Sequence, residues 1–288
     1  MKAVFRHELR SYFTNVSGYV FGAFLLLFAG IYTMVYNLKS GVANFEYVPA
    51  SMGFVFLVTV PILTMRVLAE ERRQRTDQLL YSLPLRMSEV VLGKYAAMLV
   101  MLLLPTAVMC LYPVVLTAYG NVPLASAYGA LTGFFFLGAS LISIGTFISS
   151  VTESQAVAAG LCFVVMLINY FLASLADFVS DGAFASLAAF TALIVVLGVI
   201  FYLMTKNGFA SVVLGVILEA ALLLAYAFKS AAFEGLFPKV MENLSLYERF
   251  FTFVNGVFDL TGLVYYVTII GVFLFLSVES MEKRRWSE

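Results

Sequence analysis

Long apolar runs alternate with short polar segments along almost the whole chain. Each run is close to the ~20 residues that a helix needs to cross a bilayer. These runs predict eight candidate transmembrane helices, at about 18–38, 50–68, 93–118, 126–149, 156–176, 184–205, 210–228 and 260–280. The part from 184 to 228 has a second interpretation, as a re-entrant or partly interfacial segment. We therefore expect an all-α polytopic membrane protein with six to eight transmembrane helices.

Composition supports this class and excludes a water-soluble one. The chain is 62% hydrophobic and only 12% charged, whereas soluble domains carry about 25% charged residues. No soluble packing could bury so much apolar surface. The formal net charge is zero, so the overall charge indicates no nucleic-acid partner.

The distribution of Lys and Arg predicts the orientation of the chain. If the N-terminus lies inside, nearly all basic residues fall on the cytoplasmic side, and the exceptions outside are Lys39, Lys229, Lys239 and Arg249. Loops on the cytoplasmic side of membrane proteins carry an excess of Lys and Arg. We therefore expect a multi-pass protein with both termini in the cytoplasm.

The first 17 residues have the pattern of an amphipathic helix. One side of this helix carries Val4, Phe5, Leu9, Tyr12, Phe13 and Val16, and the other carries Lys2, Arg6, His7 and Arg10. A basic helix of this kind lies flat on an anionic membrane surface. Residues 1–17 are therefore predicted to form an interfacial helix in contact with membrane lipid.

A second amphipathic segment is predicted outside the membrane, at about 229–259. Ser245 followed by Glu248 has the spacing of a capping box that opens a short helix, and Gly256 is placed to end it. The segment reads as one or two helices on the outer surface. Two interpretations stay open, a cap over a pathway exit and a packing lid without a gating role.

The region from Arg66 to Lys94 holds ten charged residues between two apolar spans. Residues 67–82 suit a helix, Pro84 interrupts it, and Ser88 suits the N-cap of the next helix. A short cytoplasmic helix between two spans can transmit force from a soluble partner into both of them. The alternative is a solvated charged loop that only fixes topology.

The run AEERRQRTDQLLYSLPLRMSEVVLGKY, residues 69–95, resembles the signature of ABC-2 type permeases. In that family an acidic pair, a threonine, a leucine-rich turn, a proline and a Gly-Lys pair follow one another. The matching positions here are Glu70, Glu71, Thr76, Leu79, Leu80, Pro84, Gly93 and Lys94. Residues 145–160 resemble the family's small-residue turn between two later spans. The C-terminal stretch from Gly256 is similar to the gliding-motility-type and nitrous-oxide-accessory-type branch. Arg75 stands where the family often has glycine, and the family core has six spans.

The resemblance implies a permease subunit of an ATP-driven ABC exporter in the bacterial cytoplasmic (inner) membrane. It implies two copies of a cytoplasmic ABC ATPase as partners, and a second permease subunit that is either another copy or a related chain. The coupling helix would lie at about 67–84, and its ATPase-coupling residues would be Glu70, Glu71, Arg72, Arg73, Arg75, Thr76, Leu79, Leu80 and Pro84. Glu153, in the turn at 150–155, would make a second contact.

The sequence contains no G-x-x-x-x-G-K-[ST] loop to hold phosphates. We therefore expect this chain not to be an enzyme and to bind no cofactor, with ATP and Mg²⁺ bound by the partner ATPase. His7 is the only histidine, and no cluster has the spacing of metal ligands. No catalytic or metal-binding residue is predicted.

Glu219 lies near the middle of an apolar run. A charged carboxylate at the centre of a transmembrane helix costs roughly 2.5–3.5 kcal/mol or more, so it should face protein or water or be protonated. One interpretation is a substrate or proton contact. The alternatives are a neutral carboxyl hydrogen-bonded to a neighbouring helix, and a span boundary that lies elsewhere.

Two further function classes stay open for the whole chain. One is an ion-driven secondary transporter or channel, and the other is a membrane scaffold in a motility or accessory complex.

Overall fold

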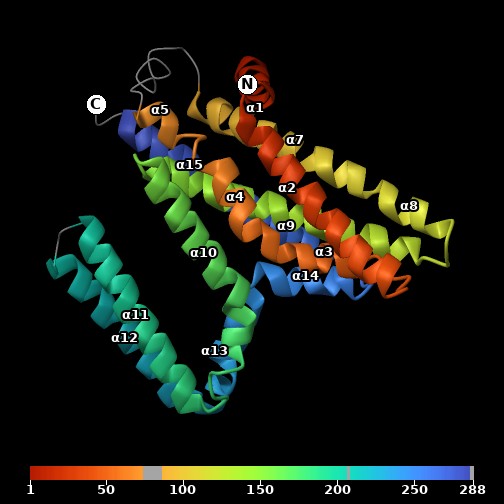
Figure 1. The fold of residues 1–288 in the computed structure, drawn as a ribbon. Coiled ribbons are helices and arrows are strands. Elements are labelled where there is room, and N and C mark those ends of the chain that lie inside the picture. The colour runs from red at the N-terminus through yellow and green to blue at the C-terminus, as the bar shows by residue number, and fades with distance from the viewer. Residues whose placement is uncertain (74–85, 206–207, 286–288) are drawn as a thin grey trace. The chain divides into compact units, whose positions relative to one another are not determined.

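The computed structural model describes residues 1–73, 86–205 and 208–285, and this part of the chain is helical with no strand. The chain divides into two compact units. Unit 1 comprises Met1–Ile168 and Arg249–Glu288, and unit 2 comprises Asn169–Glu248. Figure 1 shows the helices of both units in chain order.

Seven helical stretches among the described residues are long and apolar enough to cross a membrane. They are Val16–Lys39, Tyr47–Glu71, Met87–Thr117, Leu124–Val151, Gln155–Ala176, Ser211–Phe228 and Leu260–Arg284. The remaining predicted span, at about 184–205, falls on α11 (Ala183–Thr205). The apolar part of this helix, Ala183–Val199, is shorter than the seven stretches above. The prediction of an all-α polytopic membrane protein with six to eight transmembrane helices is confirmed.

Unit 1 is a bundle built from both ends of the chain. Its N-terminal part contains α1 (Lys2–Thr14), α2 (Val16–Thr33), η1 (Met34–Lys39), α3 (Tyr47–Met52), η2 (Gly53–Val55), α4 (Phe56–Thr64) and α5 (Ala69–Arg73). The remainder contains α7 (Met87–Met109), α8 (Leu111–Thr117), α9 (Leu124–Val151), most of α14 (Leu246–Val254), α15 (Leu260–Arg285) and the first part of α10 (Gln155–Ala176). Asn15 adopts an extended conformation, and this break separates the predicted surface helix from the first span.

The core of unit 1 forms around α9, which packs against α4, α7 and α15 (Figure 1). Phe56 of α4 stacks on Phe134 of α9 with ring centroids 4.4 Å apart. The Tyr95 hydroxyl of α7 donates a hydrogen bond to the Ala139 carbonyl at 3.1 Å. Side chains of α4 and α7 therefore help to fix the position of α9.

Two glycines of α9 allow this close packing. A Cβ atom added at Gly138 would lie 2.8 Å from atoms of Leu102 and Phe56. One added at Gly145 would lie 2.5 Å from Thr64 Oγ1. These glycines therefore serve packing inside this chain, because small residues let transmembrane helices approach closely.

Unit 2 contains the remainder of α10, the hairpin of α11 and α12 (Gly208–Phe228), η3 (Ser230–Phe233) and α13 (Leu236–Leu244). The hairpin helices run antiparallel in Figure 1. The backbone closes at its base, where the Gly235 amide donates to the Asp181 carbonyl at 2.8 Å. Asn169 also joins distant segments, because its amide group donates to Leu244 O at 3.3 Å and accepts from Leu246 N at 3.2 Å.

The predicted outer segment, about 229–259, folds as η3, α13 and α14. The Glu248 amide donates to Ser245 Oγ at 3.2 Å, so Ser245 caps the start of α14 as predicted. Gly256 follows the end of this helix with a left-handed φ of 79°, a conformation that glycine adopts without strain. Both local predictions are confirmed.

We predict that Gly145→Val destabilises the protein by roughly 1–3 kcal/mol, because overpacking a close helix contact forces the neighbouring atoms apart. Gly129→Val is the matched control on the same helix, since a Cβ there meets no atom within 4 Å. Thermal unfolding of the detergent-purified variants should show a lower melting temperature for Gly145→Val alone. Equal melting temperatures for the two variants would contradict the packing described for α9.

Candidate functional site

One end of unit 1 gathers segments that are far apart in the sequence. The backbone amides of Leu68 and Ala69 both donate to Ser149 Oγ at the end of α9, at 3.2 and 3.1 Å. The Ser280 hydroxyl near the end of α15 donates to the Ser150 carbonyl at 3.2 Å. We call this region, formed by α1, α5, the start of α7 and the ends of α9 and α15, the charged end.

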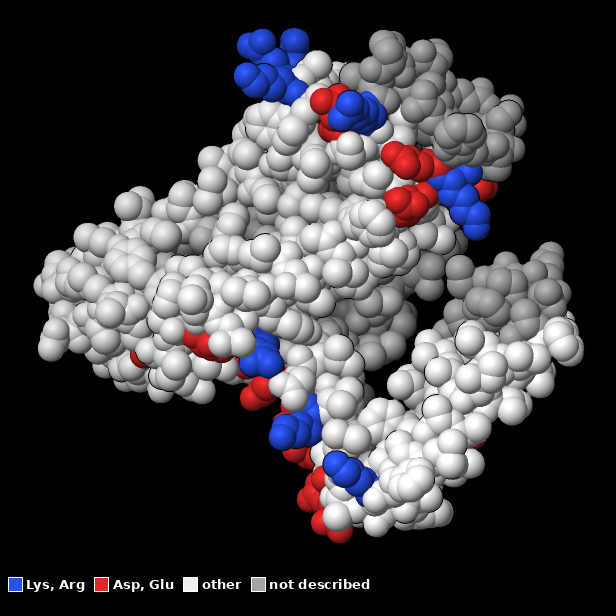
Figure 2. All heavy atoms as spheres, turned by 180° about the vertical axis from the view of Figure 1, so that it is seen from behind, with Lys and Arg blue, Asp and Glu red and all other residues white. Residues whose placement is uncertain are grey.

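Charged side chains mark this end on the molecular surface. Figure 2 shows Lys, Arg, Asp and Glu grouped around α1, α5 and the end of α15, beside a broad uncharged surface along the helices of unit 1. An uncharged helical surface with charges at its end is the pattern expected for a bundle that crosses a bilayer. The first and last described helices, α1 and α15, reach the same end of unit 1.

A buried ion cluster lies inside the charged end. Lys94 Nζ donates to Glu8 Oε1 at 2.6 Å and to Glu71 Oε1 at 2.7 Å. The Lys94 side chain is only 2% exposed, whereas Glu8 is 16% and Glu71 is 24% exposed. We call Glu8, Glu71 and Lys94 the triad. It connects α1, α5 and α7, which are separate segments of the sequence.

The local sequence explains how the triad forms. Val4, Glu8 and Tyr12 are spaced by four residues, so they share one face of α1. A Cβ at Gly93 would lie 3.2 Å from the Val4 side chain, so the glycine lets α1 approach α7. Lys94 follows Gly93 directly. The Gly-Lys pair therefore supplies both the close approach and the cation that meets Glu8.

The energetics of the triad depend on the burial of Lys94. Removing an ammonium group from water carries a penalty of several kcal/mol, which is offset only when oppositely charged partners bond to it with good geometry. The two carboxylates provide these bonds and retain partial access to water. Lys94 is therefore held tightly, and loss of both partners would leave an uncompensated buried charge.

Glu70, the other member of the acidic pair, makes a different contact. Its carboxylate accepts from Arg66 Nε at 3.0 Å across one helical turn, and an exposed pair of this kind contributes only ~0–1 kcal/mol. A polar cavity of about 50 Å³ lies between this pair and α1, and Tyr12 forms part of its wall. Burial raises the pKa of the Tyr12 phenol, and the Glu8 carboxylate raises it further, so this wall stays uncharged.

The turn between α9 and α10 is fastened to the end of α15. Arg284 Nη2 donates to the Val151 carbonyl at 2.9 Å, and Nη1 approaches Glu153 Oε1 at 3.4 Å. The Glu153 side chain is 79% exposed. Glu153 therefore lies at the surface of the charged end, where a soluble partner could reach it.

The structure thus places some of the predicted coupling residues together. Glu70, Glu71 and Glu153 all lie at the charged end, and Arg72 and Arg73 lie in α5 beside them. Glu71 points inward to Lys94 instead of outward. Five predicted residues fall outside the described part of the chain: Arg75, Thr76, Leu79, Leu80 and Pro84.

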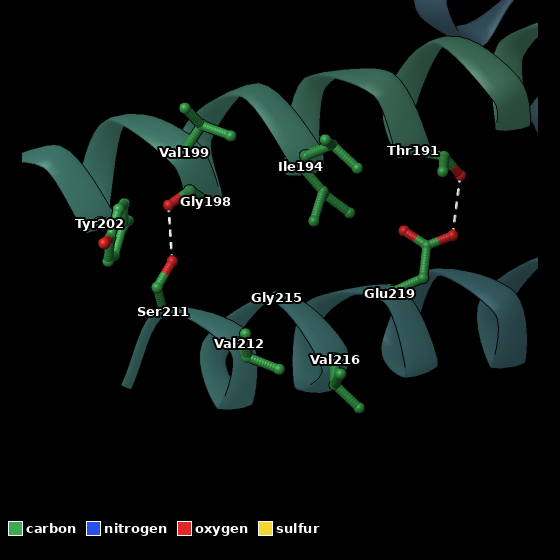
Figure 3. A pocket seen from close by; sticks show the side chains of 11 residues that line it. Thr191, Ile194, Gly198, Val199, Tyr202, Ser211, Val212, Gly215, Val216 and Glu219 are labelled. Carbon is green, nitrogen blue, oxygen red and sulfur yellow. Dashed lines mark hydrogen bonds between the residues drawn. The ribbon is translucent and has the colours of Figure 1, made fainter. Parts of the chain in front are cut away.

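Glu219 belongs to the other unit, in the hairpin of α11 and α12. Figure 3 shows it rising from α12 toward Thr191 of α11, and the Thr191 hydroxyl donates to Glu219 Oε1 at 2.8 Å. It borders a groove of about 450 Å³ between the two helices. The neighbouring-helix hydrogen bond that the sequence offered as one interpretation is present, and the groove beside it leaves room for a ligand.

Sequence reasoning missed Glu8 and the inward role of Glu71. Glu8 is the only acidic residue in α1, among Lys2, Arg6 and Arg10, and Lys94 is a cation inside the start of a span. A buried cation needs an acidic partner. That signal pointed to an ion pair, although the sequence does not specify which carboxylates provide it.

A comparison with protein families finds the family of this chain. A family model described as "ABC-2 family transporter protein" matches residues 28–182. A comparison with curated proteins finds no match. The matched region begins within α2 and includes α5, α7 and the turn that carries Glu153, and it ends just before α11.

We predict that the triad behaves as a unit in stability measurements. The double variant Glu8→Gln/Glu71→Gln leaves Lys94 buried without a carboxylate and should lose about 3–5 kcal/mol of unfolding free energy. Adding Lys94→Met to this double variant should restore part of the loss, since no charge then remains buried. Equilibrium unfolding in detergent measures both. A triple variant less stable than the double variant would contradict the buried ion cluster.

Proposed function

The chain belongs to the ABC-2 family of transporter proteins and is a membrane-spanning permease of an ABC transporter, and we propose that it couples a cytoplasmic ATPase to the export of a substrate. The observation that carries this proposal is the triad. It fastens the start of the predicted coupling segment to two other helices at the charged end.

The proposed coupling runs through α5. This helix continues the span Tyr47–Glu71, and Glu71 binds Lys94 at the start of the next span. Lys94 in turn holds Glu8 on α1. A displacement of α5 by a docked ATPase would therefore move the two spans it joins and the N-terminal helix together, instead of bending a loose loop.

Glu71 has a revised role in this proposal. It acts as a positioning residue that transmits movement within the chain, whereas the ATPase contact falls to the segment that follows it and to the exposed Glu153. Arg72, Arg73, Arg75, Thr76, Leu79, Leu80 and Pro84 form the proposed docking segment. Glu70 lies at the start of that segment, paired with Arg66.

The proposed assembly has two permease subunits and two ATPase subunits. The ATPase supplies the ATP and Mg²⁺ sites, which fits the absence of a phosphate-binding loop from this sequence. We place the complex in the bacterial cytoplasmic membrane, with the charged end and both termini in the cytoplasm, because Lys and Arg concentrate there. Membership in the gliding-motility-type or nitrous-oxide-accessory-type branch stays a prediction.

We predict that a P-loop ATPase copurifies with the tagged chain from its own cells in mild detergent. The double variant Leu79→Asp/Leu80→Asp should reduce the recovered ATPase at least tenfold, because charges would disrupt an apolar docking surface. Glu71 is unsuitable for this purpose, since its change would also disturb Lys94. Mass spectrometry of the eluate identifies and quantifies the ATPase.

The matched control for this pull-down is Val257→Asp/Phe258→Asp. These two side chains are exposed and precede α15, at the end of unit 1 opposite the charged end. This variant should retain the ATPase. Absence of any ATPase from the native eluate contradicts ATP-driven export, and full retention by the Leu79/Leu80 variant contradicts the docking segment.

We predict that the charged end faces the cytoplasm. In a background with Cys110→Ala and Cys162→Ala, a single Ser40→Cys should react with a membrane-impermeant maleimide in intact cells. A single Arg6→Cys on α1 should react only after the membrane is permeabilised. Ser40 and Arg6 are both exposed, so accessibility reports the side of the membrane. The reverse labelling pattern would overturn the proposed orientation.

A further inference from the structure

The hairpin of α11 and α12 lies beyond the region that the family model matches, which ends at residue 182. Its two helices enclose a groove of about 450 Å³. Sites for small molecules occupy about 300–1,000 Å³ and combine apolar walls with a few polar groups. The groove has this size and composition.

One polar group in the groove lacks a partner. Thr191 satisfies Glu219 Oε1, whereas Glu219 Oε2 is buried and has no hydrogen-bond partner within the described part of the chain. Buried polar atoms without partners are rare in native proteins, and each one calls for an explanation. The atom lies at the edge of the groove, so a ligand there could supply the missing donor.

The charge of the surroundings favours a cationic ligand. Between Lys206 and Lys229 the sequence contains one residue of the Asp, Glu, Lys, Arg and His types, which is Glu219, and α11 contains none of them. No lysine or arginine of the hairpin helices themselves therefore compensates a carboxylate at this position. A positively charged N–H donor would satisfy the unpaired oxygen and the uncompensated charge together, whereas a neutral alcohol would satisfy only the oxygen.

The remainder of the groove fits an apolar body. Its walls are mainly aliphatic side chains from both helices: Ile194, Val195, Val199, Val212 and Val216. Gly198 and Gly215 leave open space between the helices, and a Cβ at Gly215 would meet no atom within 4 Å. At the far end of the groove Ser211 donates to the Gly198 carbonyl at 2.6 Å, which leaves Tyr202 as the terminal wall (Figure 3).

We propose that the hairpin binds a lipophilic primary amine, with the ammonium group on Glu219 Oε2 and the apolar body along the groove toward Tyr202. This site goes beyond the proposed coupling function, because it needs neither the ATPase nor the charged end. Thr191 is a positioning residue that holds the carboxylate in place. Glu219 and the space beside Gly215 determine the class of ligand.

The test uses the full chain in phosphatidylcholine nanodiscs and a dodecylamine probe with a diazirine on its alkyl chain. After irradiation, mass spectrometry should map crosslinks to α11 and α12. Unlabelled dodecylamine should compete at least tenfold more effectively than dodecanol, which lacks the charge. Competition is needed because any amphiphile also partitions into the lipid.

Two variants and one control distinguish crosslinking at the site from non-specific crosslinking. Glu219→Gln should reduce hairpin crosslinking at least tenfold, whereas Glu234→Gln, the same change at an exposed carboxylate of unit 2, should leave it unchanged. Gly215→Leu fills the groove and keeps the carboxylate, and it should also reduce crosslinking. The melting temperature of each variant shows whether it has folded.

Several outcomes would overturn the proposal. Equal competition by dodecanol would identify a groove for acyl chains of lipid. Crosslinking retained in a folded Glu219→Gln variant would remove the carboxylate from the site. Absence of hairpin crosslinks in the native chain would mean that another occupant, such as a second copy, covers the groove. None of these results affects the ATPase pull-down, so the two proposals fail separately.

Discussion

The arrangement of the charged end depends on one buried ammonium group. Lys94 is almost fully removed from water and bonded to two carboxylates, one from the N-terminal helix and one from the helix that precedes the predicted docking segment. A cation in this position tolerates little displacement, because any separation from its partners exposes it to an apolar surrounding. The three elements therefore keep a fixed mutual position while helices elsewhere can tilt.

This constraint complements the packing of α9. Glycines at two positions of α9 bring it against α4 and α7, and the hydroxyl of Ser149 at its end holds the backbone of α5. Ion-pair and hydrogen-bond contacts thus hold the charged end, while apolar packing with a few hydrogen bonds holds the interior of the bundle.

The sequence predicted features that depend on composition or on short spacing. Apolar length was enough to locate the spans, and the Ser245 cap followed from a three-residue spacing. The triad could not be predicted, because Glu8 meets Lys94 only after α1 folds back on α7, and the spacing within each helix does not specify which other helix it meets. For Glu219 the sequence indicated an energetic problem. It could not indicate that Thr191, 28 positions earlier, satisfies one oxygen and leaves the other unpaired.

The hydrogen bond between Gly235 and Asp181 has a consequence for how this chain is built. Asp181 before the hairpin and Gly235 after it are hydrogen-bonded to each other. The two ends of the hairpin therefore lie close together. Insertions whose ends lie close together are the ones that a folded domain tolerates. The hairpin therefore has the anatomy of a cassette, a segment whose two ends lie close enough together for a short linker to join them.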